Sequence, residues 1–254
     1  MIIDTHAHYD DEAFDEDRES ILMSMNDNGI EAIVNIGASM EGCRQTLALA
    51  EKYSFVYGAL GVHPDSVADL TEDDFEWLRQ SIRNPKIVAV GEIGLDYHWN
   101  DNKEEMKNWF ARQMELARET SLPIVVHSRE AAADTLDVIK ANNGGEIGGI
   151  IHCFSYGKEI AREYLNMGFY LGIGGVLTFK NAKKLREVVE YAPLEQIVLE
   201  TDCPYLAPVP YRGKRNSSLY IPYVVNAIAD IKNVTPEEVV DITNRNAKRV
   251  YRLV

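Results

Sequence analysis

Short runs of apolar residues recur along the whole chain, and a longer segment with apolar residues at helical spacing follows each of them. Short apolar runs between turn-forming residues are typical of buried strands, whereas apolar positions three and four apart indicate an amphipathic helix. The strands predicted in this way lie at residues 2–8, 31–37, 56–62, 87–93, 122–129, 148–154, 169–174 and 197–202. The chain therefore repeats one unit, a strand followed by a helix.

The predicted helices separate these strands and also form the end of the chain. Gly29 caps a first helix that carries Ile21 and Leu22, and Thr71 starts another one. Further helices are predicted at about residues 40–52, 103–120, 129–142, 157–167, 180–191, 220–231 and 236–251. Eight strand–helix units favour an α/β fold of the (β/α)8 TIM-barrel type over a doubly wound sheet. We expect a single domain that covers residues 1–254.

The charge of the chain limits how it can bind a polyanion. The formal net charge is −14, whereas bulk electrostatic affinity for nucleic acid comes from Lys and Arg side chains that displace counterions. A polyanionic substrate must therefore be held locally, by metal ions and a few placed cations. A basic loop with Arg212, Lys214 and Arg215, after the last predicted strand, offers such cations.

Several features predict a cytoplasmic protein. No apolar run approaches the ~18 residues of a membrane span, and the N-terminus lacks the pattern of a signal peptide. Three cysteines without paired spacing indicate reduced thiols. Cys153 and Cys203 follow candidate metal ligands, but the neighbour of an inward-facing strand residue faces outward, so we interpret both as small buried residues. We expect no membrane partner and no obligate protein partner.

Residues that can bind metal ions stand at the ends of the predicted strands. His6 and His8 are one residue apart, so their imidazoles share one face of a strand and can chelate an ion. Glu92 interrupts an apolar run, and a buried carboxylate needs a partner because burying an unpaired charge is costly. The complete set is His6, His8, Glu92, His127, His152 and Asp202. Barrel enzymes keep their chemistry at the C-terminal ends of the strands, so this set predicts a binuclear metal centre there.

Six motifs occur in a fixed order along the chain. They are Ile3–His8, Gly61–Pro64, Val90–Asp96, Pro123–Arg129, His152–Phe154 and Leu199–Tyr205. Together they resemble the TatD family of metal-dependent deoxyribonucleases, a branch of the amidohydrolase-like barrels, over essentially the whole chain. Tyr9 and Ala133 depart from the residues usual in that family. Neither is a proposed ligand.

The resemblance implies a role for each member of the ligand set. His6 and His8 hold one metal ion, and His127 and His152 hold the second. Glu92 bridges the two ions. Asp202 ligates the first ion and takes the proton of the attacking water, so Asp202 and Glu92 are the expected catalytic residues.

The resemblance also implies that His63 and Arg129 face the substrate phosphate. Arg129 lies two residues beyond His127, which puts it on the same strand face, and its planar guanidinium suits a phosphate. The alternatives are an ion pair at the start of a helix for Arg129 and an ordinary loop position for His63. Glu200 shares its strand face with Asp202, where it binds a further metal ion or orients a ligand.

The implied reaction is hydrolysis of DNA phosphodiester bonds, with trimming of single-stranded or frayed DNA from the 3′ end. Two divalent ions per subunit are implied, and Zn, Mn, Mg, Ni and Fe all suit this ligand set. The alternative is an acyl or amide hydrolase such as a D-aminoacyl-tRNA deacylase, because the same activated water attacks carbonyl groups. A non-catalytic binding module is disfavoured, since structural zinc sites close their coordination.

Overall fold

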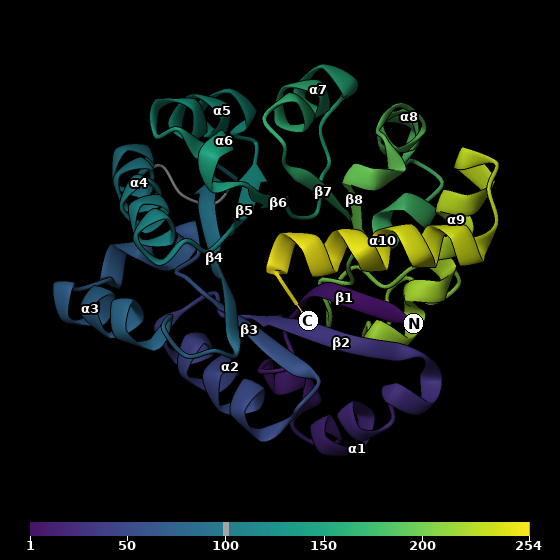
Figure 1. Cartoon of the computed structure of the whole chain (residues 1–254), viewed down its shortest axis with the longest axis horizontal. Helices are drawn as coiled ribbons and strands as arrows, with labels where there is room; N and C mark the ends of the chain where they lie inside the picture. The colour runs from purple at the N-terminus through teal and green to yellow at the C-terminus, as the bar shows by residue number, and fades with distance from the viewer. Residues whose placement is uncertain (99–101, 254) are drawn as a thin grey trace.

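Eight parallel strands lie side by side in chain order in the computed structural model, which describes residues 1–98 and 102–253 (Figure 1). The strands are β1 Ile2–Ala7, β2 Ile30–Ile36, β3 Val56–Leu60, β4 Ile87–Asp96, β5 Ile124–Arg129, β6 Gly149–Ile151, β7 Tyr170–Ile173 and β8 Ile197–Leu199. Helices surround them, and the predicted (β/α)8 barrel is confirmed. No helix within the described residues is long and apolar enough to cross a membrane.

Backbone hydrogen bonds between β1 and the segment after β8 close the barrel at its C-terminal end. The His8 amide donates to the Cys203 carbonyl at 2.8 Å, and the Asp202 amide donates to the His6 carbonyl at 2.9 Å. Three of these residues are predicted metal ligands: His6 in β1, His8 directly after it, and Asp202 after β8. Closure of the barrel and placement of the candidate site therefore depend on the same contacts.

The helices are α1 Arg18–Met23, α2 Met40–Lys52, α3 Glu72–Ser81, α4 Lys103–Thr120, α5 Ala132–Ala141, α6 Gly144–Ile147, α7 Lys158–Asn166, α8 Lys183–Tyr191, α9 Ile221–Lys232 and α10 Pro236–Tyr251. The expected helix over 129–142 starts late, because Glu130 adopts a left-handed φ of 54° that separates β5 from α5. The predicted start at Thr71 is confirmed, since its side chain and that of Asp74 form a capping box at α3.

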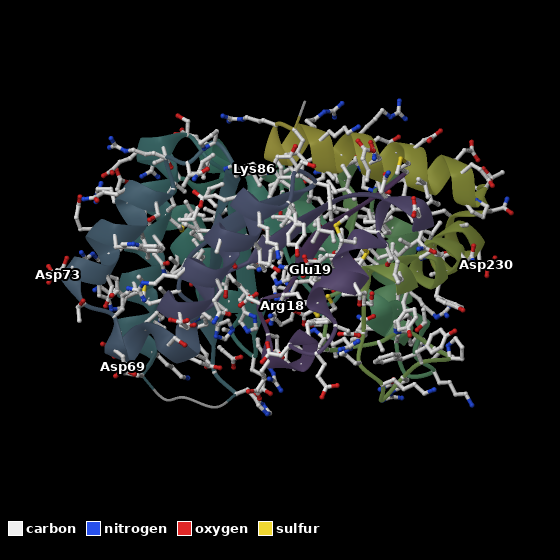
Figure 2. All side chains as sticks on the ribbon, turned by 90° about the horizontal axis from the view of Figure 1, so that it is seen from below. Arg18, Glu19, Asp69, Asp73, Lys86 and Asp230 are labelled. Atoms are coloured by element: carbon white, nitrogen blue, oxygen red, sulfur yellow. The ribbon has the colours of Figure 1, made fainter. Side chains whose placement is uncertain are left out.

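Helix α10 covers the N-terminal end of the barrel, where it crosses in front of the strands near both chain termini (Figure 1). Its residues Val250 and Tyr251 pack with side chains of the barrel interior, and the Tyr251 hydroxyl donates to the Thr5 carbonyl at 2.8 Å. Lys86, which precedes β4, lies on this side of the molecule, whereas Asp69, which follows β3, lies on the opposite side (Figure 2). One end of the barrel is thus closed, and the other is left for chemistry.

Two strands end earlier than the apolar pattern predicts. β6 ends at Ile151 rather than 154, and β8 ends at Leu199 rather than 202. The chain leaves the strand ladder because Cys153 and Asp202 have left-handed φ angles of 43° and 56°. The candidate ligands at these positions consequently sit just past the last paired residue, where the backbone turns over the barrel mouth.

Candidate metal centre

A cavity of about 620 Å³ opens at the C-terminal end of the barrel. It is lined by His8, Asp10, Asp11, Ala38, His63, Asp65, Glu92, Asp96, His127, Arg129, His152, Asp202 and Tyr205. His6 is fully buried beneath it. Of the predicted site residues, Glu200 alone neither lines this cavity nor belongs to the group of candidate metal ligands at its base.

The first group of ligand atoms surrounds the ring nitrogens of His6 and His8 at the end of β1. The Nε2 atoms of His6 and His8 are 3.2 Å apart, and Oδ1 of Asp202 lies 3.7 and 3.3 Å from them. Ligand atoms around a four-coordinate zinc ion with bonds of ~2.1 Å lie about 3.4 Å apart. The spacing of these atoms therefore fits one divalent ion.

The second group of ligand atoms surrounds one carboxylate oxygen of Glu92. Its Oε1 atom lies 2.7 Å from Nδ1 of His127 and 2.8 Å from Nε2 of His152, and these two nitrogens are 3.4 Å apart. Its Oε2 atom lies 3.5 Å from Nε2 of His6. Each oxygen of one buried carboxylate thus faces a different set of nitrogens, as a bridging ligand requires.

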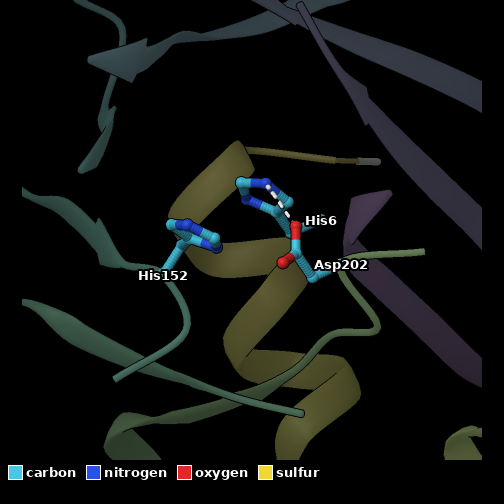
Figure 3. A group of neighbouring side chains, drawn as sticks. All are labelled: His6, His152 and Asp202. Atoms are coloured by element: carbon cyan, nitrogen blue, oxygen red, sulfur yellow. Dashed lines mark ion pairs between the residues drawn. The ribbon is translucent and has the colours of Figure 1, made fainter. Parts of the chain in front are cut away.

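His6 and His152 connect the two groups through their rings. The rings are stacked, with centroids 3.9 Å apart and planes 14° from parallel, and Asp202 lies beside His6 (Figure 3). These side chains come from the ends of β1, β6 and β8, which are distant in sequence. Six predicted ligands from five strand ends are therefore brought into one cluster.

Hydrogen bonds behind the cluster select which nitrogen of two histidines faces it. Nδ1 of His8 lies 2.9 Å from the Ile36 carbonyl and must carry a proton to bond it, so Nε2 is the nitrogen that faces the cluster. Nε2 of His127 lies 3.0 Å from Oδ2 of Asp96, which leaves Nδ1 for an ion. Outer partners of this kind orient metal-binding histidines and make them better ligands.

Asp96 is a site residue that the ligand set drawn from the sequence does not contain. It lies on β4 four residues after Glu92, so the strand period places both carboxylates on one face. The predicted strand ended at residue 93, which hid that signal. Asp4 was missed for another reason, because its partners are distant in the sequence. Its carboxylate is fully buried and accepts hydrogen bonds from Ser218 at 2.6 Å and from the Thr201 hydroxyl at 2.7 Å.

The charges of the cluster suit cations. Burial would lower the pKa of His8, but hydrogen bonding to Asp202 and the negative charge around it outweigh burial and raise that pKa to about 10. Burial likewise opposes the effect of Asp96 and Glu92 on His127, whose pKa rises to about 9. Burial would raise the pKa of Glu92, yet the surrounding histidines hold it well below its usual range. The carboxylates thus favour positive charge on the nitrogens that face them, which a metal ion would supply in place of a proton.

His63 presents a hydrogen-bond donor to the cavity. Its Nδ1 accepts from the Asp65 amide at 3.2 Å, so the proton of the neutral ring is on Nε2, which lies 4.0 Å from Oε1 of Glu92. Burial lowers the pKa of His63 to about 4, which keeps the ring neutral at pH 7. The Arg129 side chain lines the same cavity, so both predicted phosphate-binding residues lie beside the ligand cluster.

Glu200 lies behind His152. Its Oε1 accepts from the Cys153 amide at 2.6 Å and is 3.8 Å from Nδ1 of His152. Burial raises the pKa of Glu200 to about 8. Gly172 leaves room for this carboxyl group, since a Cβ there would be 2.0 Å from Oε2. This placement favours the orienting alternative for Glu200 over a further metal ion.

A (β/α)8 barrel with histidines and carboxylates gathered at its strand ends is the architecture of a metal-dependent hydrolase. The family model described as "TatD related DNase" matches residues 3–252. The chain therefore belongs to the TatD family.

Similar proteins agree with this membership. The uncharacterized metal-dependent hydrolase YabD of Bacillus subtilis is 43% identical over 254 residues and is matched over all of both chains. The uncharacterized metal-dependent hydrolase YcfH of Escherichia coli is 33% identical over 257 residues, with 100% of this chain and 96% of the relative covered. The crystal structure of the TatD homologue YjjV of Escherichia coli superposes with a TM-score of 0.94 at 30% identity, covering 100% and 98% of the two chains. The protein is thus a metal-dependent hydrolase of the TatD family.

Proposed function

We propose that this hydrolase is a deoxyribonuclease that cleaves phosphodiester bonds and trims single-stranded or frayed DNA from the 3′ end. The observation that carries the proposal is the split environment of Glu92, whose two oxygens face separate sets of nitrogens. His63 and Arg129 line the cavity above it, where a phosphate would need hydrogen-bond donors. The description of the matching family as DNase supports the same substrate class.

Each ligand would have a defined place in this reaction. His6, His8 and Asp202 would hold one divalent ion, His127 and His152 would hold the other, and Glu92 would reach both. Divalent ions bound there lower the pKa of a coordinated water and neutralise charge that gathers on phosphate oxygens. Residues 1–254 would act as one catalytic domain.

The side chains of the cavity supply the proton acceptor and the phosphate donors. Burial would raise the pKa of Asp202, but hydrogen bonding to His8 and the nearby histidines lower it, so this carboxylate stays ionised and accepts the proton of the attacking water. His63 donates a hydrogen bond through Nε2, and Arg129 adds a permanent positive charge. Both donors favour a phosphate, on which negative charge is spread over several oxygens.

A substrate comparison tests the proposal. The metal-reconstituted protein is incubated with single-stranded DNA labelled at either end and, in parallel, with D-aminoacyl-tRNA. We expect shortening of DNA from the 3′ end and no measurable deacylation. Deacylation without DNA cleavage would reject the proposal in favour of the acyl hydrolase, and loss of label from the 5′ end would reject only the polarity.

Arg129→Ala tests how phosphate is bound. We expect KM for DNA to rise about tenfold, with unchanged metal content and melting temperature, because an interaction equally strong in ground and transition states is reported by KM. The matched control is Arg249→Ala on α10, at the far end of the barrel. A large fall in melting temperature with KM unchanged would show that Arg129 supports the fold instead.

A further inference from the structure

The two longest stretches without an acidic residue both lie in the second half of the chain. Residues 164–186 carry Lys180, Lys183, Lys184 and Arg186, and residues 203–229 carry Arg212, Lys214 and Arg215. These stretches therefore have seven cations and no Asp or Glu, whereas the rest of the chain has 40 acidic residues against 19 cations. Such segregation within a chain of net charge −14 marks one sector as suited to a polyanion.

The two acid-free stretches lie against each other. The Val209 amide donates to the Thr178 hydroxyl at 2.8 Å, and the guanidinium carbon of Arg212 lies 4.4 Å from the centre of the Phe179 ring. The first stretch ends in the first turn of α8 and the second contains most of α9, and these two helices are neighbours at one side of the barrel beside β7 and β8 (Figure 1). Their cations therefore belong to one sector of the molecule.

Aromatic rings occupy the same sector. Tyr211 and Tyr220 are stacked with centroids 4.2 Å apart, and Tyr223 meets Tyr211 edge-on at 5.5 Å. Tyr223 remains 37% exposed, and Nζ of Lys214 lies 5.9 Å from the centre of the Tyr211 ring. We call Tyr211, Arg212, Lys214, Tyr220 and Tyr223 the tyrosine platform.

The loop after β8 connects the platform to the candidate metal centre. Tyr205 lines the catalytic cavity, and its hydroxyl donates to Asp11 at 2.8 Å, although the side chain is 56% exposed. Leu206 and Val209, which follow it, are exposed apolar residues on the way to Tyr211. A bound polymer that leaves the cavity along this loop would therefore meet exposed apolar side chains first and the tyrosine platform next.

We propose that the tyrosine platform binds the part of a single-stranded nucleic acid that lies several nucleotides away from the bond being cleaved. Bases stack on tyrosine rings irrespective of sequence, while Arg212 and Lys214 contact the phosphates. The proposal rests on the proposed function and adds to it a substrate class, namely strands long enough to span the cavity and the platform. It also explains how an acidic protein holds a polyanion.

A nucleic acid fits this sector better than an anionic lipid surface or an acidic peptide. The cations alone would suit all three. Stacked and edge-on tyrosines beside them add flat ring surface, which is what unpaired bases recognise. The loop that starts at Tyr205 in the cavity reaches the platform at Tyr211, and the cavity also contains His63 and Arg129, the proposed phosphate-binding residues.

The test compares long and short substrates with charge-reversed variants. The platform variant is Arg212→Glu with Lys214→Glu, and the control is Arg245→Glu with Arg249→Glu on α10, which makes the same charge change at the opposite end. Turnover is measured on a 12-nucleotide oligothymidylate and on thymidine 5′-p-nitrophenyl phosphate. Binding of the labelled 12-mer is measured by fluorescence anisotropy in EDTA at several salt concentrations.

We expect the platform variant to lower the ratio of kcat/KM for the 12-mer to that for the short ester about tenfold or more. Its binding should lose about 1.4 of the slope of log affinity against log salt, since each single-strand phosphate contact contributes ~0.7. Tyr223→Ala should weaken 12-mer binding about 5-fold or more, as stacking of one base is worth ~1–3 kcal/mol. The control should resemble the parent in all three measurements.

Equal behaviour of platform and control variants would overturn the proposal. Binding to phosphatidylserine vesicles is measured in parallel, and a platform variant that loses vesicle binding but keeps 12-mer binding would overturn it as well. If the charge reversal lowers the melting temperature, Arg212→Gln with Lys214→Gln replaces it and is held to the same criteria. The anisotropy arm is independent of cleavage. A parent that binds the 12-mer through the platform but cleaves neither substrate would reject the proposed function alone, while a parent that cleaves DNA without using the platform would reject this inference alone.

Discussion

The two ends of the barrel differ in what they bury: apolar side chains at one end and ionisable side chains at the other. At the N-terminal end, Val250 and Tyr251 of α10 pack on an interior of small and branched apolar side chains. At the C-terminal end, buried polar groups replace them, with His6, Glu92 and His152 exposed by at most 6%. An apolar cluster stabilises by removing surface from water, whereas buried ionisable groups cost free energy unless each has a partner. Apolar packing at the N-terminal end therefore offsets the free-energy cost of the buried ionisable groups at the C-terminal end.

Continuity between the ends is what makes this division possible. β1 carries Thr5, whose carbonyl accepts from Tyr251 of α10, and the same strand carries His6 into the ligand cluster. Asp4 on this strand is bonded to Thr201 and Ser218, which fixes the β1 end against the β8 loop. A well-packed strand therefore delivers its ligand with little freedom, which is the condition for a preorganised site.

The largest expected effect follows from removing the charge that both ligand groups share. Glu92→Gln keeps the volume but removes the negative charge, so we expect kcat/KM to fall more than about 10³-fold and metal content to drop, because metal-assisted hydrolysis loses its common ligand. Activity assays and elemental analysis measure the two quantities. A variant that retains full metal stoichiometry and turnover would show that Glu92 does not bridge.

Breaking the opposite end should change stability and leave the chemistry alone. Tyr251→Ala removes a large buried side chain from the barrel base, so we expect the free energy of unfolding to fall by about 3 kcal/mol, with kcat within twofold of the parent below the melting temperature. Tyr251→Phe is the control, since it removes only the hydrogen bond to Thr5 and should cost about 1 kcal/mol. Chemical denaturation gives both values, and a large loss of kcat would mean that the two ends are not separable.

Asp96 offers a smaller change within the catalytic end. Asp96→Asn keeps the shape but removes the charge that faces Nε2 of His127, so we expect a 10- to 100-fold loss in metal affinity or activity. Asp73→Asn on α3 is a matched control at an exposed position. Metal titration by calorimetry separates this outcome from unfolding. Unchanged affinity would place Asp96 outside the support of the ligand.

The sequence allowed the apolar strands and the ligands beside them to be predicted, because both are local signals. A carboxylate inside an apolar run, such as Glu92, stands out without any knowledge of its partners. The left-handed residues that end the strands did not stand out, since Cys153 and Asp202 are not glycines and their φ angles follow from tertiary contacts. The identity of the ions and the roles of individual ligands stay predictions.

Pairs that are distant in the chain account for the rest of what was not predicted. Asp4 meets Ser218 across 214 positions, and no periodicity links them. Arg215 was expected to offer a cation to phosphate along with its neighbours in the loop. Its guanidinium instead makes two hydrogen bonds to the carboxylate of Asp17, at 2.8 and 2.5 Å, and lies 4.8 Å from the centre of the Phe14 ring. The charge is visible in sequence, but its partner is not.

The smallest expected effect concerns this ion pair at the rim of the catalytic end. Hydrogen bonding to Arg215 lowers the pKa of Asp17 below its ordinary value of 3.8, so the pair stabilises the fold above that pH, and the contribution is lost as the pH falls through the lowered value. Both side chains are partly exposed, and screening by solvent limits the gain to within about 0.5 kcal/mol. Asp17→Asn should therefore change the free energy of unfolding at pH 7 by no more than this, with the difference from the parent vanishing as the pH falls through the lowered pKa, as measured by urea denaturation. A loss several times larger would mean that the pair holds the β8 loop in place, and the polar surface of the catalytic end would then contribute to stability as the apolar end does.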